Sequence, residues 1–417
     1  MKCLVVVLDA CQPAYLGCYG NDWLVTPTLD ELASHSVVFD QHFAPEPTPS
    51  AVRWNWLTGR WLLPDAATGR RRFPRLPQLL WEHDIATVLI GDERSPSRNR
   101  LPGRGWEAMH WIRQCRVGDL EQESPLGGTV QTAVEWLKTN QGLKNWLVWL
   151  ELASLRAPWH PSEFDKEALE GHPEADLEPL FDPPLGQVLS KDIVTAEPSE
   201  AKSLVERAAA TYAGVVYGVD QWLGMLLDQV RELGMYDELL IVITSDVGWP
   251  LGQHGVVGDQ PAHLHEELIH LPLVVKLPNQ EQAGRRVQQL TLAVDLMPTL
   301  AEAFGIPVPE SVHGFGLLST ARGQPLQRRE YICSHSRIEN ADQWLLRTHE
   351  WCLRLSGQTG QLFVKPEDRW EVNDVANLHP EVAEHLELTL RRFAEVLRQD
   401  RLDLVPLVRR ELLRLAQ

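Results

Sequence analysis

The chain has 417 residues, of which 44% are hydrophobic and 23% charged, as in ordinary globular proteins with a large core. The formal net charge of −18 disfavours binding to nucleic acids and anionic membranes, because both present negative surfaces. No apolar run is long enough to span a bilayer, and the apolar start at 3–8 is interrupted by Asp9. We therefore expect a cytoplasmic protein, with free thiols at its six scattered cysteines.

Apolar strands and amphipathic helices alternate along most of the chain. The expected strands are at 3–10, 85–92, 145–152, 238–246 and 271–278. The expected helices are at 27–35, 75–83, 129–139, 202–233 and 294–304. This pattern predicts an α/β fold with a mostly parallel central sheet sandwiched by helices. In such folds functional groups gather at the carboxyl ends of the strands, where we expect Asp9 and Asp246 to lie.

The C-terminal part has a different pattern. A boundary near 320–329 predicts an α/β domain of residues 1–325 and a small C-terminal domain of residues 326–417. Four short strand-like runs in the second domain predict a small antiparallel sheet. Two helices, at about 380–397 and 404–416, are expected to close the chain.

Several blocks of the sequence, taken in order, resemble the sulfatase family of the alkaline-phosphatase superfamily. They include "LDACQPAYLGCYG" at 8–20, "LTGR" at 57–60, "TSDVGWPLGQHGV" at 244–256 and "VDLMPTLAEAFGIPVPESVHGFGLL" at 294–318. Each block is weak alone, but their order and spacing together are specific. The resemblance implies an alkaline-phosphatase-like α/β fold.

The resemblance also implies a set of functional positions. In sulfatases a divalent cation, usually calcium, is held by two aspartates near the first strand, by an Asp-Asn or Asp-His pair after a later strand, and by the nucleophile. That nucleophile is a formylglycine made from the Cys or Ser that opens the motif C/S-x-P-x-R. An arginine, two lysines and two histidines bind the sulfate and move protons.

The nucleophile motif is altered in this chain. Arg53 stands at the arginine position, but Pro49 stands at the nucleophile position and Ala51 at the motif's proline. Proline offers no oxygen, sulfur or N–H group that attacks an ester or binds a metal. Thr48 and Ser50 flank it and are the alternative nucleophiles, although a hydroxyl residue before a first-turn proline is typical of a helix N-cap. The candidate catalytic residues are thus Arg53, Thr48 and Ser50.

The metal-binding positions are partly retained. Asp9 and Asp246 match family aspartates, while Ala10 and Val247 stand where further ligands are expected. Calcium takes roughly 6–8 oxygen ligands, so two carboxylates offer too few. We therefore interpret Asp9 and Asp246 as a relic metal site. We expect no cofactor, with Ca²⁺ or another divalent cation as the alternative.

The anion-binding positions have also changed. Asp92 and Arg94 stand where the family often has Lys and His, Arg156 replaces a His, and a Lys position falls near Asp259. Because the transition state gathers negative charge, the loss of one stabilising donor costs roughly 2.7–4 kcal/mol. Acids at two such positions predict a site without the family's chemistry.

Without a metal, Asp9 and Asp246 would repel each other at close range, and one of them would tend to hold a proton. Arg53 could instead lie between them as a built-in cation and pair with both through its planar guanidinium. We hypothesise that Arg53 replaces the calcium ion, since these three residues alone persist among the family positions.

Two functions stay open at this point. The first is an inactive sulfatase-like protein, a pseudoenzyme, that acts by binding or assembly. The alternative is an active sulfuric or phosphoric ester hydrolase with a rearranged, metal-dependent site. Neither names a ligand; the candidate partners are a second copy of the chain or an active paralogue.

Histidines and tryptophans near these blocks have simpler interpretations. The stretch "PAHLHEELIHLP" at 261–272 looks like a metal cluster, but its spacing matches no usual zinc motif. We expect structural roles for these histidines and for His254 in "GQHGV". Among the 16 tryptophans, Trp54, Trp56 and Trp249 lie near the expected site, where we interpret them as core filling.

Overall fold

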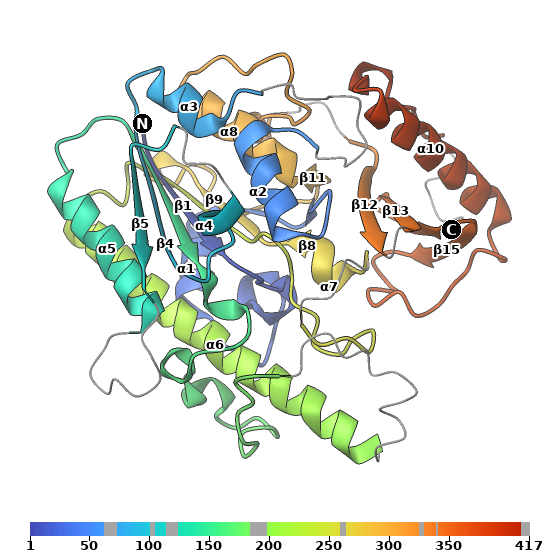
Figure 1. The fold of residues 1–417 in the computed structure, drawn as a ribbon, viewed down its shortest axis with the longest axis horizontal. Coiled ribbons are helices and arrows are strands. Elements are labelled where there is room, and N and C mark those ends of the chain that lie inside the picture. Colours follow the sequence, from blue (N-terminus) through green and yellow to red (C-terminus); the bar gives the residue numbers. More distant parts are fainter. Residues whose placement is uncertain are drawn as a thin grey trace.

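The computed structural model describes residues 1–61, 73–100, 105–113, 124–183, 198–258, 264–324, 329–338 and 341–409. Its centre is an eight-stranded sheet with the order β10-β2-β9-β7-β1-β6-β4-β5 (Figure 1). The strands are β1 (Lys2–Leu8), β2 (Val37–Phe39), β4 (Ala86–Asp92), β5 (Ala108–Ile112), β6 (Trp146–Leu152), β7 (Leu239–Thr244), β9 (Leu273–Lys276) and β10 (Arg285–Val287). Only β9 runs antiparallel to its neighbours, so the predicted mostly parallel sheet is confirmed.

Helices cover both faces of this sheet. Along β1, Cys3, Val5 and Val7 point to one face, where they pack with α2 (Pro49–Thr58), α3 (Leu76–Trp81) and α8 (Leu296–Ala303). The alternate residues Leu4, Val6 and Leu8 pack with α1 (Pro27–Ser34), α5 (Pro125–Thr139) and α6 (Pro198–Glu232) on the other face. Burial on both faces explains why the central strands are continuously apolar in sequence.

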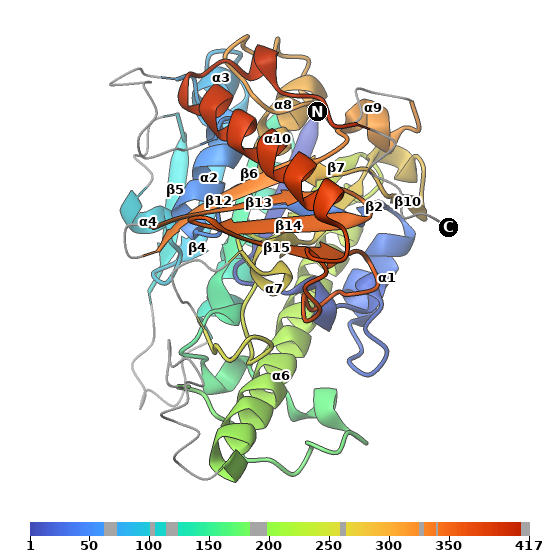
Figure 2. The same cartoon turned by 90° about the vertical axis from the view of Figure 1, so that its right-hand side faces the viewer.

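A second, antiparallel sheet lies near the C-terminus. It contains β12 (Ile332–Ile338), β13 (Ala341–Arg347), β14 (Trp351–Ser356) and β15 (Thr359–Val364), as predicted. The helix α10 (Pro380–Arg398) crosses this sheet (Figure 2). The second expected helix does not begin as predicted, because Leu402–Leu404 form a 3₁₀ turn and 405–409 are not helical; the rest of it lies outside the described residues.

The small sheet shares its core with the main sheet. Trp344 and Leu345 of β13 belong to the same apolar cluster as Val5 of β1. The division at residue 325 stays a prediction. Further short elements are β3 (His42–Phe43), β8 (His270–Leu271) and β11 (Thr291–Leu292), which form a three-stranded sheet, and the helices α4 (Ser97–Arg100), α7 (Glu266–Ile269) and α9 (Leu318–Ala321).

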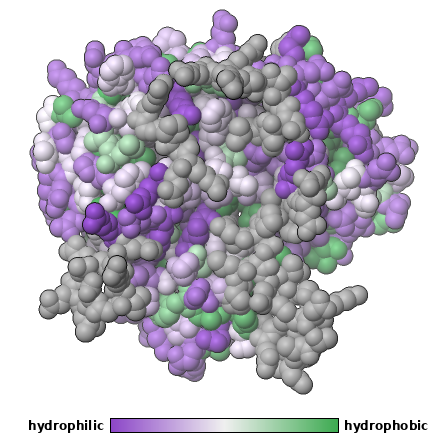
Figure 3. Space-filling view, in the orientation of Figure 1, coloured by the Kyte–Doolittle hydropathy of each residue, from purple (hydrophilic) through white to green (hydrophobic). Residues whose placement is uncertain are grey.

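The surface is of mixed polarity, and the described cysteines form no disulfide bonds. On the face shown in Figure 3, apolar residues are scattered among hydrophilic ones. Within the described residues, no helix has both the length and the apolarity needed to cross a membrane. The described cysteines are free, as expected, and all but Cys18 are buried; Cys115 lies outside the described residues.

Candidate functional site

Asp9 and Asp246 lie side by side at the carboxyl edge of the central sheet. Asp9 directly follows β1 and Asp246 comes two residues after β7, and these two strands are parallel neighbours. Both aspartates have no solvent exposure. One oxygen of Asp246, Oδ1, accepts hydrogen bonds from the backbone N–H groups of Ala10 (3.0 Å) and Val247 (2.7 Å). The sheet topology therefore brings together two acids that are 237 positions apart in sequence.

Arg53 lies between these two acids. It is on α2, one turn after Pro49, and its side chain is 1% exposed. Its Nη1 donates to Oδ2 of Asp246 at 2.6 Å, and its Nη2 donates to Oδ1 of Asp9 at 2.6 Å. The structure therefore has the arrangement that we hypothesised from the sequence, with a guanidinium bridging both carboxylates.

A third acid, Glu151, completes the pocket around this guanidinium. Its Oε1 accepts from Arg53 Nε at 3.2 Å and from the Ser97 hydroxyl at 2.5 Å, and the Ser95 hydroxyl donates to its Oε2. Glu151 is in β6, opposite Val7 of β1, and it was missed in the sequence. A signal was present, because a single charged residue inside an otherwise apolar strand seldom stays unpaired when buried.

A second arginine lies beside Asp246, past the carboxyl end of strand β6. Arg156, just after β6, donates from Nη2 to Oδ2 of Asp246 at 3.1 Å. Its guanidinium carbon lies 5.8 Å from the ring centre of Trp249, which is fully buried. Asp246 thus faces two guanidinium groups.

Burial and charge act differently on the two aspartates. Burial raises the pKa of Asp9 well above its usual value, although Arg53 opposes this effect. Burial would also raise the pKa of Asp246, but Arg53 and Arg156 together with the Ala10 N–H hold it below its usual value. The guanidinium groups of Arg53 and Arg156 therefore favour the charged form of Asp246 more than that of Asp9.

Comparison with known proteins places these residues in a family. Residues 2–306 match the family model described as sulfatase, and residues 252–386 match the model of the C-terminal part of N-sulphoglucosamine sulphohydrolase. The chain belongs to the sulfatase family. The resemblance found in the sequence is therefore confirmed.

Individual sulfatase relatives match over most of the chain. Iduronate 2-sulfatase of Mus musculus is 24% identical over 409 residues, which cover 79% of this chain and 73% of the relative. An arylsulfatase of Clostridium perfringens is 21% identical over 437 residues, 90% of each chain.

Solved structures share the fold. The phosphonate monoester hydrolase of Agrobacterium radiobacter has a TM-score of 0.74 and 20% identity over 96% of both chains. A protein solved with its substrate D-glucosamine-2-N,6-O-disulfate also has a TM-score of 0.74, with 18% identity over 97% of this chain and 99% of that chain.

The divalent cation typical of sulfatases does not fit the described residues. Asp246 uses Oδ1 for two backbone N–H groups and Oδ2 for two arginines, and Asp9 uses Oδ1 for Arg53. Of the four carboxylate oxygens of these two aspartates, only Oδ2 of Asp9 is buried without a hydrogen-bond partner. One oxygen is far from the roughly 6–8 that calcium takes, and two guanidinium groups repel a cation there.

The nucleophile position also differs from sulfatase chemistry. Pro49 is the first residue of α2, and the Thr48 hydroxyl accepts a hydrogen bond from the N–H of Ala51 at 3.4 Å. The N-cap interpretation of Thr48 is therefore confirmed. Ser50 lies in the first helical turn and is half-buried. Whether Thr48, Ser50 and Arg53 take part in catalysis stays untested.

The two changed anion-binding positions on the β4 side neutralise each other. Asp92 ends β4, and Arg94 donates to it at 2.7 Å and to Glu163 at 2.9 Å. Glu163 was not foreseen, because it belongs to a 3₁₀ turn far along the chain. Arg94 is thus held by two acids. Asp259 lies outside the described residues.

The histidine interpretations can be tested in part. His254 has two acceptors, Glu267 Oε1 at 2.6 Å from Nδ1 and the carbonyl of Trp370 at 2.8 Å from Nε2. Both ring nitrogens face acceptors, so the doubly protonated imidazolium form satisfies both contacts. Burial would lower the pKa of His254, but the hydrogen bond and charge of Glu267 raise it.

This pairing argues against a metal ion at the neighbouring cluster of His254, His265 and Glu371, whose ligand atoms lie within 4.8 Å of one another. An imidazolium has no lone pair for a metal. Arg354 already donates to Glu371 at 2.9 Å and to His265 Nδ1 at 2.6 Å. His270 contacts the carbonyl of Asp40 at 2.9 Å, and His263 lies outside the described residues. The expected structural roles fit His254, His265 and His270.

Proposed function

We propose that this member of the sulfatase family has lost sulfatase chemistry and acts as a binding or assembly protein. One observation carries the proposal: the guanidinium of Arg53 fills the space between Asp9 and Asp246, with hydrogen bonds of 2.6 Å to each. A resident cation at this place takes over the charge balance that a metal would otherwise supply. It cannot activate a nucleophile, because it has neither an open coordination position nor Lewis acidity.

Two further observations support the proposal. Pro49 offers no nucleophilic atom at the family's position, and the neighbouring Thr48 hydroxyl caps α2. The arginines that could attract a sulfate are already paired: Arg156 with Asp246 and Arg94 with Asp92 and Glu163. An incoming anion would therefore compete with buried carboxylates for each arginine.

Turnover of p-nitrophenyl sulfate and p-nitrophenyl phosphate, with and without added calcium, tests this proposal. We expect no release of nitrophenol above that of a heat-denatured sample. Turnover that disappears in Asp246→Ala and persists in the matched control Asp22→Ala, an exposed aspartate, would overturn it. That outcome would establish instead the rearranged hydrolase with Thr48 or Ser50 as nucleophile.

We also propose which kind of protein this chain binds. A second copy of the chain or an active paralogue is the partner that a noncatalytic sulfatase fold would bind through its retained surfaces. Co-purification of a tagged chain with an untagged copy, and with sulfatases of the same cell, tests this. Recovery of neither would remove the assembly role and leave ligand binding.

A further inference from the structure

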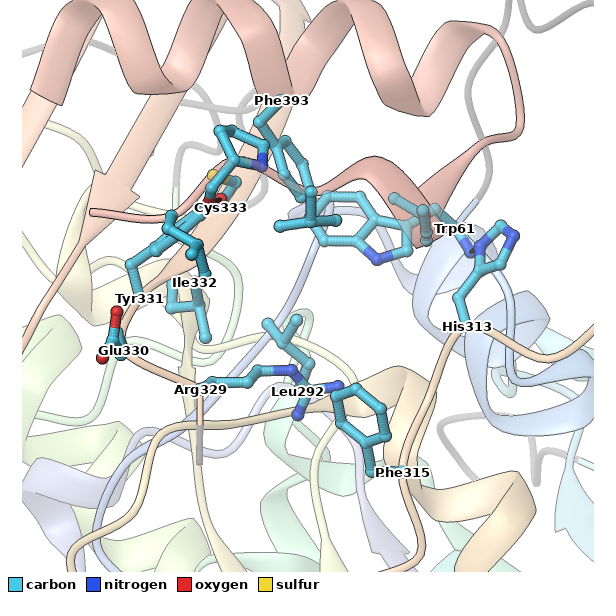
Figure 4. A pocket seen from close by; sticks show the side chains of 14 residues that line it. Trp61, Leu292, His313, Phe315, Arg329, Glu330, Tyr331, Ile332, Cys333 and Phe393 are labelled. Atoms are coloured by element: carbon cyan, nitrogen blue, oxygen red, sulfur yellow. Dashed lines mark hydrogen bonds between the residues drawn. The ribbon is translucent and has the colours of Figure 1, made fainter. Parts of the chain in front are cut away.

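A cavity of about 400 Å³ shares no lining residue with the Asp9–Arg53–Asp246 site and is lined by β11, the loop before α9, β12 and α10 (Figure 4). Its walls come from separate parts of the chain: Trp61 after α2, Phe315 in the loop before α9, Ile332 at the start of β12, and Phe393 on α10. Binding sites for small molecules usually have about 300–1,000 Å³. The cavity therefore has the size of a ligand site and shares no lining residue with the family's active-site positions.

The cavity walls are aromatic and aliphatic. Trp61 and Phe393 meet edge to face with ring centres 5.4 Å apart, and Tyr331 meets Phe393 at 6.2 Å. Leu292 and Ile332 add buried aliphatic surface. Figure 4 shows these side chains around an open space. Rings already fixed by one another present apolar faces without further ordering, which favours binding of an apolar guest.

The polar groups on the walls are already satisfied within the protein. His313 accepts from the N–H of Trp61 at 3.3 Å through Nδ1 and contacts Asp400 at 3.0 Å through Nε2. Burial, helped by Arg60, lowers the pKa of His313 to about 4, so the ring is neutral. Its single proton then sits on Nε2 and is donated to Asp400.

The remaining charges are paired or peripheral. Both terminal nitrogens of Arg329 donate to the buried carboxylate of Asp295, and the Tyr331 hydroxyl donates to the carbonyl of Pro406 at 2.7 Å. Glu330 is at the edge of the cavity, on the side away from Trp61 (Figure 4). A charged ligand would lose its hydration without gaining a free counter-charge from His313 or Arg329.

We propose that this cavity binds one uncharged, mainly apolar small molecule that contains an aromatic or compact branched ring system. Such a guest would cover apolar and aromatic wall surface that otherwise contacts water, which favours its binding. The same chemistry excludes a sulfated or phosphorylated sugar here, whose anionic groups would find only paired cations. This binding site is independent of the proposed loss of catalysis, so its test and the turnover test fail separately.

Titration of the native chain with the uncharged fluorescent dye phenylnaphthylamine tests the proposal. We expect saturable binding at one site and no displacement by the sulfonated analogue anilinonaphthalene sulfonate. The cavity-filling variants Leu292→Trp and Ile332→Phe are expected to bind at least about tenfold more weakly. The control Leu388→Trp, on the exposed face of α10, should bind as the native chain does.

Three results would overturn the proposal: no saturable binding by the native chain, unchanged binding in filled variants with a native unfolding midpoint, or equal competition by the sulfonated dye. If one filled variant fails to fold, the other decides. If neither filled variant folds, the proposal is tested with crystals of the native chain grown with the dye. Dye density beside Trp61 and Phe393 supports the proposal, and dye density only elsewhere refutes it.

Discussion

Arg53 Nη1 lies 2.6 Å from Asp246 Oδ2, in a place where neither side chain is more than 1% exposed. Breaking a buried pair from one side leaves a buried charge without its partner, which costs about 3–5 kcal/mol. We therefore predict that Arg53→Ala lowers the free energy of unfolding by that amount, measured by urea denaturation. The matched control is Arg286→Ala, whose guanidinium in the pair with Asp40 is 46% exposed; it should cost less than about 1 kcal/mol. Equal losses would mean that Arg53 does not hold the site together.

The two aspartates should respond differently to neutralisation. Asp9→Asn should cost less than Asp246→Asn, because burial raises the pKa of Asp9, whereas Arg53 and Arg156 hold that of Asp246 below its usual value. Asp246→Asn removes the charge that two arginines share, and should cost about 3–5 kcal/mol. Urea denaturation of both variants near neutral pH measures the difference. A larger loss in Asp9→Asn would contradict the charge assignment in the cluster.

The depressed pKa of Asp246 also predicts how the stability of the chain changes with pH. Because the pKa of Asp246 is depressed in the folded chain, its stabilisation is present above the ordinary aspartate pKa. It is lost as the pH falls through the lower, folded value. Asp246→Asn should therefore flatten the acid limb of the stability curve, while Asp9→Asn should not.

Sequence patterns predicted the parts of the fold whose cause is local. Strands β1, β4, β6 and β7 read as apolar runs because both of their faces are buried. The strands β2 and β10 have three residues each, and β5 is an edge strand with half-exposed residues, so they leave little pattern. These three were missed because pairing with the rest of the sheet, rather than their own composition, makes them strands.

The site was predictable only where strand ends meet. Arg53, Asp9 and Asp246 could be brought together from the sheet topology and from the family positions. Glu151 could be noticed as the single acid in apolar β6, but its partner Arg53 on α2 is distant in sequence; Glu163 could not be placed, since its contact with Arg94 depends on a 3₁₀ turn. Asp92 and Arg94 were both noted as changed anion-binding positions, but their ion pair with each other, shared with Glu163, was not predicted.

His254 gives a pH dependence of the opposite sign. Its pKa is raised in the folded chain by Glu267, so the charged contact stabilises fully below the ordinary histidine pKa and is lost as the pH rises through the folded value. As the pH rises above the ordinary histidine pKa, His254→Gln should flatten a decline in unfolding free energy that the native chain shows. The exposed His83→Gln is the control. An unchanged decline in His254→Gln would rule out this ion pair as its source.

Thr48 is predicted to act as a cap and not as a nucleophile. Thr48→Ala should cost about 1 kcal/mol of stability or less, because the Ala51 N–H loses the hydroxyl and keeps only the Thr48 carbonyl as acceptor, and Thr48→Ser should restore most of it. Thermal and urea unfolding measure both variants. A Thr48→Ala chain of native stability that loses an ester-hydrolysing activity would assign the hydroxyl to chemistry instead.

The most direct test of the central claim is the calcium affinity of the native chain beside Arg53→Ala, measured by isothermal titration after removal of all metal. With Arg53 in place, we predict no binding of Ca²⁺ at the Asp9–Asp246 position. In Arg53→Ala, Asp9, Asp246 and Glu151 each lose their contact with this guanidinium, and Ca²⁺ should bind among them and raise the unfolding free energy by about 2.7 kcal/mol when calcium is 100-fold above its Kd. One calcium ion bound per native chain, and lost in Asp246→Asn, would contradict it.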